Sequence, residues 1–428
     1  MSTPSSSSTS SSRAQARRSW PGGVVHRRVY TILFIAMFAS TIGVGFIGPL
    51  LPLYARDLGA AGLSLGMIFA GFSTARLLLV PFIGRLSDRF GRKLFLAIGL
   101  AAYSIFSLGY LNADSAWHLI LVRVLHGASA GMVIPVAQAY IGDIAPRGRE
   151  GSFMGTFMVS LFTAFGLGPL LGGGLADRFG MGAVFYAMGS FSAVALILVI
   201  FLLPELGLHR ERWKRRAPVR SVLSHSIVGA LLIYRIAIAL GRGVVIPFLP
   251  FVAEERGASL TMIGVLLATN IMLAGFMQIP FGKLADRAPK HVLMGIGMAA
   301  SAAVIFAIPY CRTVTHLFFL QMATGMASAL GFPSAMATAT QCGRRFNGMG
   351  TVMALFNSGM SIGLILGPLA GGFAEGIFGL DFVFKGGSLV VVGGLVAYTF
   401  LMRRAAASGA LACIEQEEDD DVPAASSG

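Results

Sequence analysis

Four arginines and the histidine His126 lie well inside long apolar runs of this sequence. Arg123 and His126 are three residues apart, so they share one face of a helix. Arg235 and Arg242 are seven apart and share a face in the same way, and the fourth arginine is Arg76. Guanidinium groups bind anions, and an imidazole with an unperturbed pKa of about 6.5 titrates in the physiological range. These residue types indicate an anion-binding or proton-carrying site. His126 is the candidate proton carrier, or else a neutral histidine held by hydrogen bonds.

The elements that must position these side chains are transmembrane helices. Hydrophobic residues make up 55% of the 428 and charged residues 12%, whereas about a quarter is charged in an ordinary soluble domain. Apolar stretches of about 20 residues, long enough to cross a membrane as helices, recur along nearly the whole chain. They predict twelve spans, near residues 29–53, 63–83, 94–111, 117–140, 152–175, 183–203, 227–251, 260–281, 292–311, 315–338, 349–373 and 383–402.

Polar side chains near the middle of a span are functional candidates. Distances from the span ends place His126, Arg242, Asn270 and Asn357 near the midplane. The arginines could instead snorkel or bond backbone carbonyls, and the asparagines could join neighbouring helices. No Asp or Glu falls securely inside a span. A cavity with cationic and no anionic side chains favours an anionic, zwitterionic or neutral solute over a cationic drug.

The basic residues are distributed by side of the membrane. The net charge of +14 could suit nucleic-acid binding, but 24 of the 33 Lys and Arg fall before the first span, in alternate loops or after the last span. The intervening loops hold five, and four lie inside spans. This positive-inside bias predicts an inner-membrane protein with both termini in the cytoplasm and no nucleic-acid partner.

The sequence repeats itself with a constant shift. Pro49 and Pro52 recur as Pro247 and Pro250, and Asp88 recurs as Asp286, each 198 residues later. The repeat predicts two structural copies of like orientation. We therefore expect an all-α membrane protein with two pseudo-symmetric six-helix bundles. Its parts are a disordered cytoplasmic N-terminus at 1–28, bundles at 29–203 and 227–402, a cytoplasmic linker at 204–226 and an acidic cytoplasmic tail at 403–428.

The stretch GRLSDRFGRK, residues 84–93, places five charged side chains between two apolar runs. At every defining position it resembles the loop signature of the major facilitator superfamily between spans two and three. The segment RVLHGASAG, residues 123–131, resembles the fourth-span motif of that family, with His126 where glutamine is usual. The resemblance covers about residues 29–402 and implies the twelve-span fold of that family.

The resemblance of the loop at residues 84–93 to the family signature implies that this loop acts as a gate. Asp88 would be stabilised by the positive helix end near Gly348–Gly350, and this contact would close the cytoplasmic side. The loop could instead serve only as a basic determinant of topology. In the second copy, Pro289 replaces Gly91, so the two loops should not adopt the same turn. The gating candidates are Gly84, Asp88, Arg89, Gly91, Arg92 and Asp286.

Glycines and prolines form matching stripes in the fifth and eleventh spans. The fifth-span stripe resembles a motif associated with drug–proton antiporters, although Ala164 replaces one of its glycines. The stripes would allow close packing and bending in a rocking bundle, or would serve ordinary helix packing alone. The helix-bending candidates are Gly168, Pro169, Gly172, Gly173, Gly367 and Pro368.

Taken with the family resemblance, these features predict a proton-coupled secondary transporter that exports a small amphiphilic or drug-like molecule. The alternative is a proton-coupled importer of an organic anion such as a carboxylate. An enzyme is disfavoured because HExxH, GxSxG and paired catalytic carboxylates do not occur, while a non-transporting sensor stays open. We expect no cofactor or metal. The expected partners are a small-molecule substrate, protons and the lipid bilayer, and the expected state is a monomer.

Overall fold

The computed structural model describes residues 24–145, 150–205, 223, 225–346 and 348–407. Within them the chain is helical and has no strand, which confirms the all-α prediction. The predicted N-terminal segment up to residue 23, most of the linker and the tail from residue 408 lie outside the described residues. The long helices are α2 (Val24–Ile47), α4 (Leu63–Phe90), α5 (Arg92–Gly109), α6 (Ala116–Ile144), α7 (Glu150–Leu202), α9 (Ser226–Glu255), α10 (Leu260–Ala285), α11 (Lys290–Ala307), α12 (Val314–Arg345), α13 (Met349–Phe378) and α14 (Leu380–Ala407).

Twelve membrane crossings can be traced through the described residues. Ten helical segments are long and apolar enough to span a membrane. One of these, α7, holds two predicted spans, because the chain changes direction at Gly180, where φ is 79°. The tenth predicted span lies in α12, which is long enough at 32 residues but carries more polar side chains. The short helix α3 (Leu51–Asp57) continues the first crossing.

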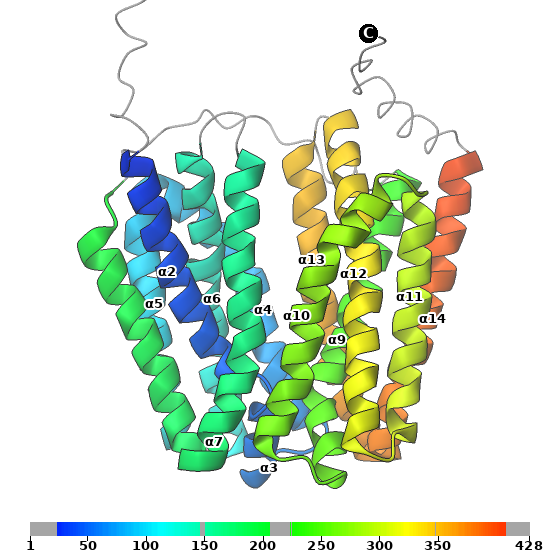
Figure 1. Ribbon diagram of the computed structural model, residues 1–428, viewed down its shortest axis with the longest axis horizontal. Coiled ribbons are helices and arrows are strands. Elements are labelled where there is room, and N and C mark those ends of the chain that lie inside the picture. Colours follow the sequence, from blue (N-terminus) through cyan, green and yellow to red (C-terminus); the bar gives the residue numbers. More distant parts are fainter. Residues whose placement is uncertain (1–23, 146–149, 206–222, 224, 347, 408–428) are drawn as a thin grey trace, which may run out of the picture.

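The helices form two groups, α2 to α7 and α9 to α14, as Figure 1 shows. We call the end at which α2 begins and α14 ends the terminal face, and the other end the opposite face. In Figure 1 the two groups lean apart toward the terminal face at the top and come together at the opposite face. The twelve-helix arrangement in two bundles is thus confirmed.

The sequence repeat reappears in the packing of each half. A Cβ at Gly127 of α6 would overlap the backbone of Phe72 in α4. Gly325 of α12 lies in the same way against Asn270 of α10, where the added Cβ would sit 2.7 Å from the backbone oxygen. Each residue of the second pair follows its counterpart by 198 positions. Glycine permits this close approach in both copies.

The apolar core shows where the two halves are joined. One cluster, near the opposite face, combines residues of both halves, such as Phe46 and Leu65 with Phe248 and Phe384. A second cluster contains first-half residues alone, among the described residues, and a third contains second-half residues alone. The halves therefore share a packed core toward the opposite face and keep separate cores toward the terminal face.

Candidate functional site

Two helix crossings join the halves near the opposite face. At the first, α10 meets α7, and a Cβ at Gly264 would overlap the carbonyl group of Pro169. At the second, α4 meets α13, and a Cβ at Gly66 would overlap the carbonyl group of Pro368. Gly264 lies 198 residues after Gly66, so the crossings are copies of one another. We call these two crossings the interhalf seal.

Further glycines of the two stripes extend the seal. Gly173 packs directly against the backbone of Leu260, and Gly372 packs in the same way against Gly62. In each case an added Cβ would overlap a carbonyl oxygen of the other half. The predicted helix-bending residues Gly173, Pro169 and Pro368 therefore lie at the contact between the halves.

The remaining residues of that set pack inside their own half. Gly168 and Gly172 of α7 lie against α2, and Gly367 of α13 lies against Gly243 of α9. The stripes thus pack in two directions at once, against the neighbouring helix of the same half and against the other half. Their predicted role in bending stays a prediction.

Two carboxylates cap helix starts across the seal. Asp177 of α7 accepts hydrogen bonds from the backbone N–H groups of Leu260 (3.2 Å) and Thr261 (2.8 Å), where α10 begins. The Thr261 hydroxyl also donates to it at 2.5 Å. Glu375 of α13 accepts from the backbone N–H of Gly62 at 2.7 Å, just before α4. A carboxylate is favoured there because a helix start leaves N–H groups unpaired and carries partial positive charge.

The Asp177 carboxyl has a pKa below its ordinary value of 3.8. Partial burial raises the pKa, but the hydrogen bonds from Thr261 and Leu260 stabilise the charged form and outweigh burial. The carboxylate is therefore ionised at neutral pH in this conformation.

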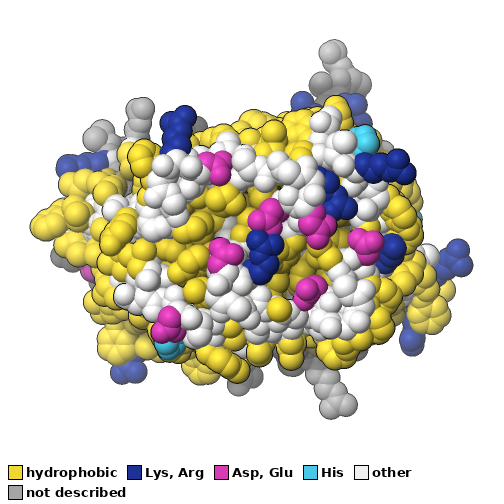
Figure 2. Space-filling model, turned by 90° about the horizontal axis from the view of Figure 1, so that it is seen from below, with side chains coloured by type: hydrophobic (Ala, Val, Ile, Leu, Met, Phe, Trp, Pro, Cys, Tyr) yellow, Lys and Arg dark blue, Asp and Glu magenta, His cyan; other side chains and the backbone are white. Residues whose placement is uncertain are grey.

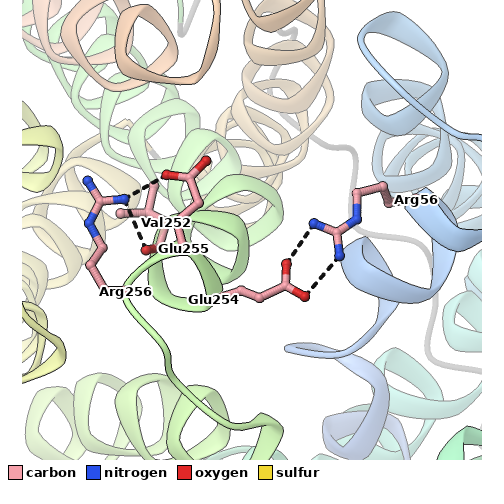
Figure 3. Close-up of polar contacts among 5 residues, drawn as sticks. All are labelled: Arg56, Val252, Glu254, Glu255 and Arg256. Atoms are coloured by element: carbon pink, nitrogen blue, oxygen red, sulfur yellow. Dashed lines mark hydrogen bonds and ion pairs between the residues drawn. The ribbon is translucent and has the colours of Figure 1, made fainter.

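An ion pair lies between the two crossings. Arg56 donates two hydrogen bonds to the carboxylate of Glu254, at 2.6 and 2.9 Å, from one half to the other (Figure 3). Beside it, Arg256 bonds Glu255 and the carbonyl of Val252 within the second half. Seen from below, acidic and basic side chains gather near the middle of the opposite face (Figure 2). The Glu254 bond raises the pKa of Arg56.

None of these four bridging residues was among the sequence-based candidates. Arg56 and Glu254 are 198 residues apart, and so are Asp177 and Glu375. Charged residues at equivalent positions of a repeat, just outside the spans, were the available signal. Their pairing could not be read from it, because it depends on which ends of the two halves meet.

The predicted gating loop lies at the terminal face. Asp88 pairs with Arg92 at 3.2 Å, and Arg92 also pairs with Asp143 of α6 at 2.5 Å. Gly91 has φ 101°, a value that favours glycine, and Glu205 packs against it. The structure shows no bond between Asp88 and the described start of α13. This agrees with halves that are separated at the terminal face.

The second copy of the loop differs as predicted. Pro289, at the position of Gly91, has φ −57° and precedes α11, so the two turns are not the same. Asp286 is exposed and makes no side-chain hydrogen bond among the described residues. Arg89 stacks on the neighbouring Phe90 ring, and Gly84 has open space around its Cα.

Arg123 and His126 belong to a buried aromatic cluster in the first half. The Arg123 guanidinium lies 4.4 Å from the ring centre of Phe72, and its Nε donates to the carbonyl of Ile68 at 3.4 Å. His126 is fully buried, with Nδ1 3.1 Å from the Tyr110 hydroxyl and Nε2 without a hydrogen-bond partner among the described residues. A buried cation and an unsatisfied ring nitrogen thus lie on one helix face.

Arg235 is held by a similar aromatic pair in the second half. Its guanidinium lies 5.2 Å from the Phe332 ring centre and 4.7 Å from that of Phe356. One terminal nitrogen contacts the Met360 sulfur at 3.0 Å, while Nε is buried without a partner among the described residues. Such cation–π contacts stabilise a desolvated guanidinium without neutralising it.

Arg242 differs from the buried candidates Arg123, His126 and Arg235. It is exposed in the middle of α9, and no described residue forms a hydrogen bond or an ion pair with it. Within the part of the chain that the structure describes, no hydrogen bond or ion pair connects it with the Arg123 cluster of the other half.

The two asparagines take separate positions. Asn270 donates from its side-chain amide to the Gln321 carbonyl at 3.3 Å, which joins α10 to α12. Asn357 is exposed on α13. The contacts of two glycines show its height relative to α9: Gly359 packs on Arg235, and Gly367 packs on Gly243. Asn357 therefore lies closer to the terminal face than Arg242 does. The described residues contain no group of three metal-binding side chains.

Comparisons with known proteins agree with this fold. The sequence pattern of the Major Facilitator Superfamily matches residues 33–237 and 231–416. An MFS-type transporter of Methanocaldococcus jannaschii is 27% identical over 88% of this chain and 98% of its own length. Multidrug resistance protein MdtG of Salmonella paratyphi A is 28% identical over 84% and 91%. A solved bacterial homologue of the human lysosomal transporter Spinster, inward-facing and unoccupied, superposes with a TM-score of 0.74 at 16% identity, over 89% of this chain and 96% of that one. The chain belongs to the Major Facilitator Superfamily.

Proposed function

We propose that this transporter exports a small amphiphilic or drug-like molecule by alternating access, driven by protons that move the other way. It would lie in the inner membrane as a monomer, with the terminal face and both termini in the cytoplasm. The observation that carries the proposal is the division of the apolar core, which is shared at the opposite face and separate at the terminal face. Such a molecule is sealed on one side and free to admit a solute from the other.

Family membership makes the chain a transporter rather than an enzyme. Export is supported by the similarity to the Salmonella relative, which is named a multidrug resistance protein. The glycine and proline stripe of α7 supports it as well, because it resembles the motif associated with drug–proton antiporters.

Proton coupling requires a group that gains and loses a proton during the cycle. We assign this role to His126, since its ring lies inside a span with one nitrogen unpaired. Arg123 beside it would sense the change in charge. When the halves rock, the surroundings of this pair change, and the proton could be taken up on one side and released on the other.

Purified protein in liposomes tests the proposal. Ethidium is placed outside inverted vesicles, and an inside-acid pH gradient is imposed. We expect ethidium to accumulate while the gradient lasts and to stop accumulating when a protonophore collapses it. Ethidium accumulation that continues after the protonophore is added would overturn proton coupling. The export proposal would be overturned if the pH gradient drives no flux of ethidium, of a neutral dye or of an anionic dye through the wild-type protein.

Import of an organic anion is the second candidate. The exposed Arg242 and the absence of acidic side chains from the middle of the described spans favour it. The two candidates differ in direction. With right-side-out vesicles and an outside-acid gradient, accumulation of benzenesulfonate, a permanent anion, above its level in protein-free vesicles would indicate import. The absence of such protein-dependent accumulation would count against import.

A further inference from the structure

Arg242 is exposed in the middle of the long helix α9, whose other exposed residue is Glu255 at its end. From Ser226 to Glu254, every other residue of α9 is buried or half-buried. This helix contacts α13, α14, α11 and α12 of its own half and α3 and α4 of the other. Because protein surrounds it, an exposed side chain in its middle does not indicate contact with lipid. It indicates a water-accessible space inside the molecule.

The position of this space follows from the neighbouring glycine. Gly243 packs against Pro368, where an added Cβ would lie 2.8 Å from the proline ring. Pro368 is also the residue that meets Gly66 in the interhalf seal. Arg242 therefore lies beside the seal, at the closed end of the space between the halves.

The charge at this place is uncompensated. Every Asp and Glu that the structure describes lies near a helix end or near the Gly180 reversal, so none sits at the middle of a span. Arg242 forms no ion pair or hydrogen bond among the described residues, and Arg235 adds a second guanidinium on the same helix face. A cation kept in a membrane interior without a counterion is costly and marks a functional site.

We infer that Arg242 binds the anionic group of an amphiphilic substrate at the closed end of the central space. Ile238 and Ile246, one turn away on either side and half-buried, offer apolar surface to the body of the molecule. Arg235 is a positioning residue, because the Phe332 and Phe356 rings hold its charge behind the site. The inference rests on the proposed transport function and narrows its substrate class to anionic and zwitterionic amphiphiles.

The test compares matched probes of opposite charge. Anthracene-9-carboxylate and 9-(aminomethyl)anthracene have the same ring system and carry an anionic or a cationic group. Their binding to full-length protein in nanodiscs is measured by fluorescence without a pH gradient. We expect Arg242→Gln to weaken carboxylate binding by about tenfold or more, which corresponds to the loss of one charge-assisted hydrogen bond. Binding of the amine should stay the same or improve.

Two further variants control for overall charge and for folding. Arg312→Gln removes one positive charge from an exposed loop position and should leave both affinities unchanged. Arg242→Lys keeps the charge and should recover part of the carboxylate affinity. If the carboxylate binds Arg242→Gln as well as wild type, or if both probes lose affinity equally, the inference is overturned.

Binding and flux separate this inference from the proposed function. If wild type exports ethidium under a pH gradient but does not bind the carboxylate, the anionic site is wrong and the export proposal stands. If the carboxylate binds in an Arg242-dependent manner but no probe is transported, the site stands and the export proposal is wrong.

Discussion

At the scale of single residues, the aromatic surroundings of His126 decide how it can act. The ring is fully buried and its Nδ1 already meets the Tyr110 hydroxyl, so Nε2 is the free position. The equivalent residue in the second half is Thr324, whose hydroxyl bonds the Leu320 carbonyl and does not titrate. The proton-carrying role that we propose for His126 therefore has no counterpart at the equivalent position of the second half.

We predict that His126→Gln flattens the pH dependence of transport between roughly pH 5.5 and 7.5, because glutamine cannot titrate in this range. Glutamine is also the usual residue of the family at this position, so folding should be retained. Transport rates across this pH range are the measurement. Thr324→Val is the matched control and should keep the wild-type profile, while an unchanged profile in His126→Gln would reassign the histidine to structure.

A second prediction at this scale concerns the Arg56–Glu254 ion pair. The side chains are 48% and 40% exposed, and exposed ion pairs contribute about 0.2–1 kcal/mol. Arg56→Ala should therefore open the opposite face only slightly. Reaction of an introduced cysteine, Ile238→Cys, with an impermeant maleimide added from that face would measure the opening, after Cys311, Cys342 and Cys413 are changed to serine. A rise of more than about tenfold would contradict this estimate.

At the scale of helices, the backbone contacts of the seal should outweigh its ion pair. Gly264→Ala places a methyl group where the Pro169 carbonyl lies, and overpacking of this kind costs about 1–3 kcal/mol. We expect the same maleimide assay to show much faster labelling than in Arg56→Ala. Gly275→Ala in the same helix is the control, because its Cβ would lie 3.9 Å from the nearest side chain, and it should label like wild type.

The cap of α10 by Asp177 predicts how the seal depends on pH. Its pKa in the sealed conformation is below the ordinary 3.8, so the cap is complete above about pH 4 and is lost as pH falls through the lowered value. The maleimide reacts with the thiolate, so labelling at each pH is divided by the labelling of a cysteine introduced at the exposed loop position Arg312. This ratio should be flat between pH 5.5 and 7.5. Asp177→Asn should raise labelling modestly and by the same factor at each pH, and a wild-type slope in this range would show that another group controls the seal.

At the scale of the whole molecule, the two faces should respond to different loops. We predict that Asp88→Asn abolishes most transport while leaving insertion intact, and that Asp286→Asn costs less, because only the first loop has the glycine turn. A carboxylate at a helix start contributes about 0.3–2 kcal/mol, enough to shift two conformations of similar free energy. Transport and cysteine accessibility from the terminal face are the measurements. Equal losses in the two variants would mean that the loop serves only as a basic anchor.

The fold was predictable from the sequence because a bilayer leaves few choices. A helix satisfies its own backbone hydrogen bonds, so apolar stretches of sufficient length already define the crossings, and the 198-residue repeat already implies two like halves. The altered turn at Pro289 was predictable as well, since proline restricts φ wherever it stands. Arg123, His126, Arg235 and Arg242 were recognisable as candidates because charge inside a span is costly at any depth.

Only the tertiary structure decided which residues meet across the halves. The sequence shows that Asp177 and Glu375 are acidic residues near the ends of spans. It also shows that Gly66 and Gly264 lie within helices. The contacts of these residues depend on how the two bundles are tilted toward each other. It likewise could not distinguish Arg235, which packs against two phenylalanine rings, from Arg242, which is exposed on the same helix face. A spacing of seven residues places two side chains on the same face of a helix. The neighbouring helices then determine whether each side chain meets an aromatic ring or open space.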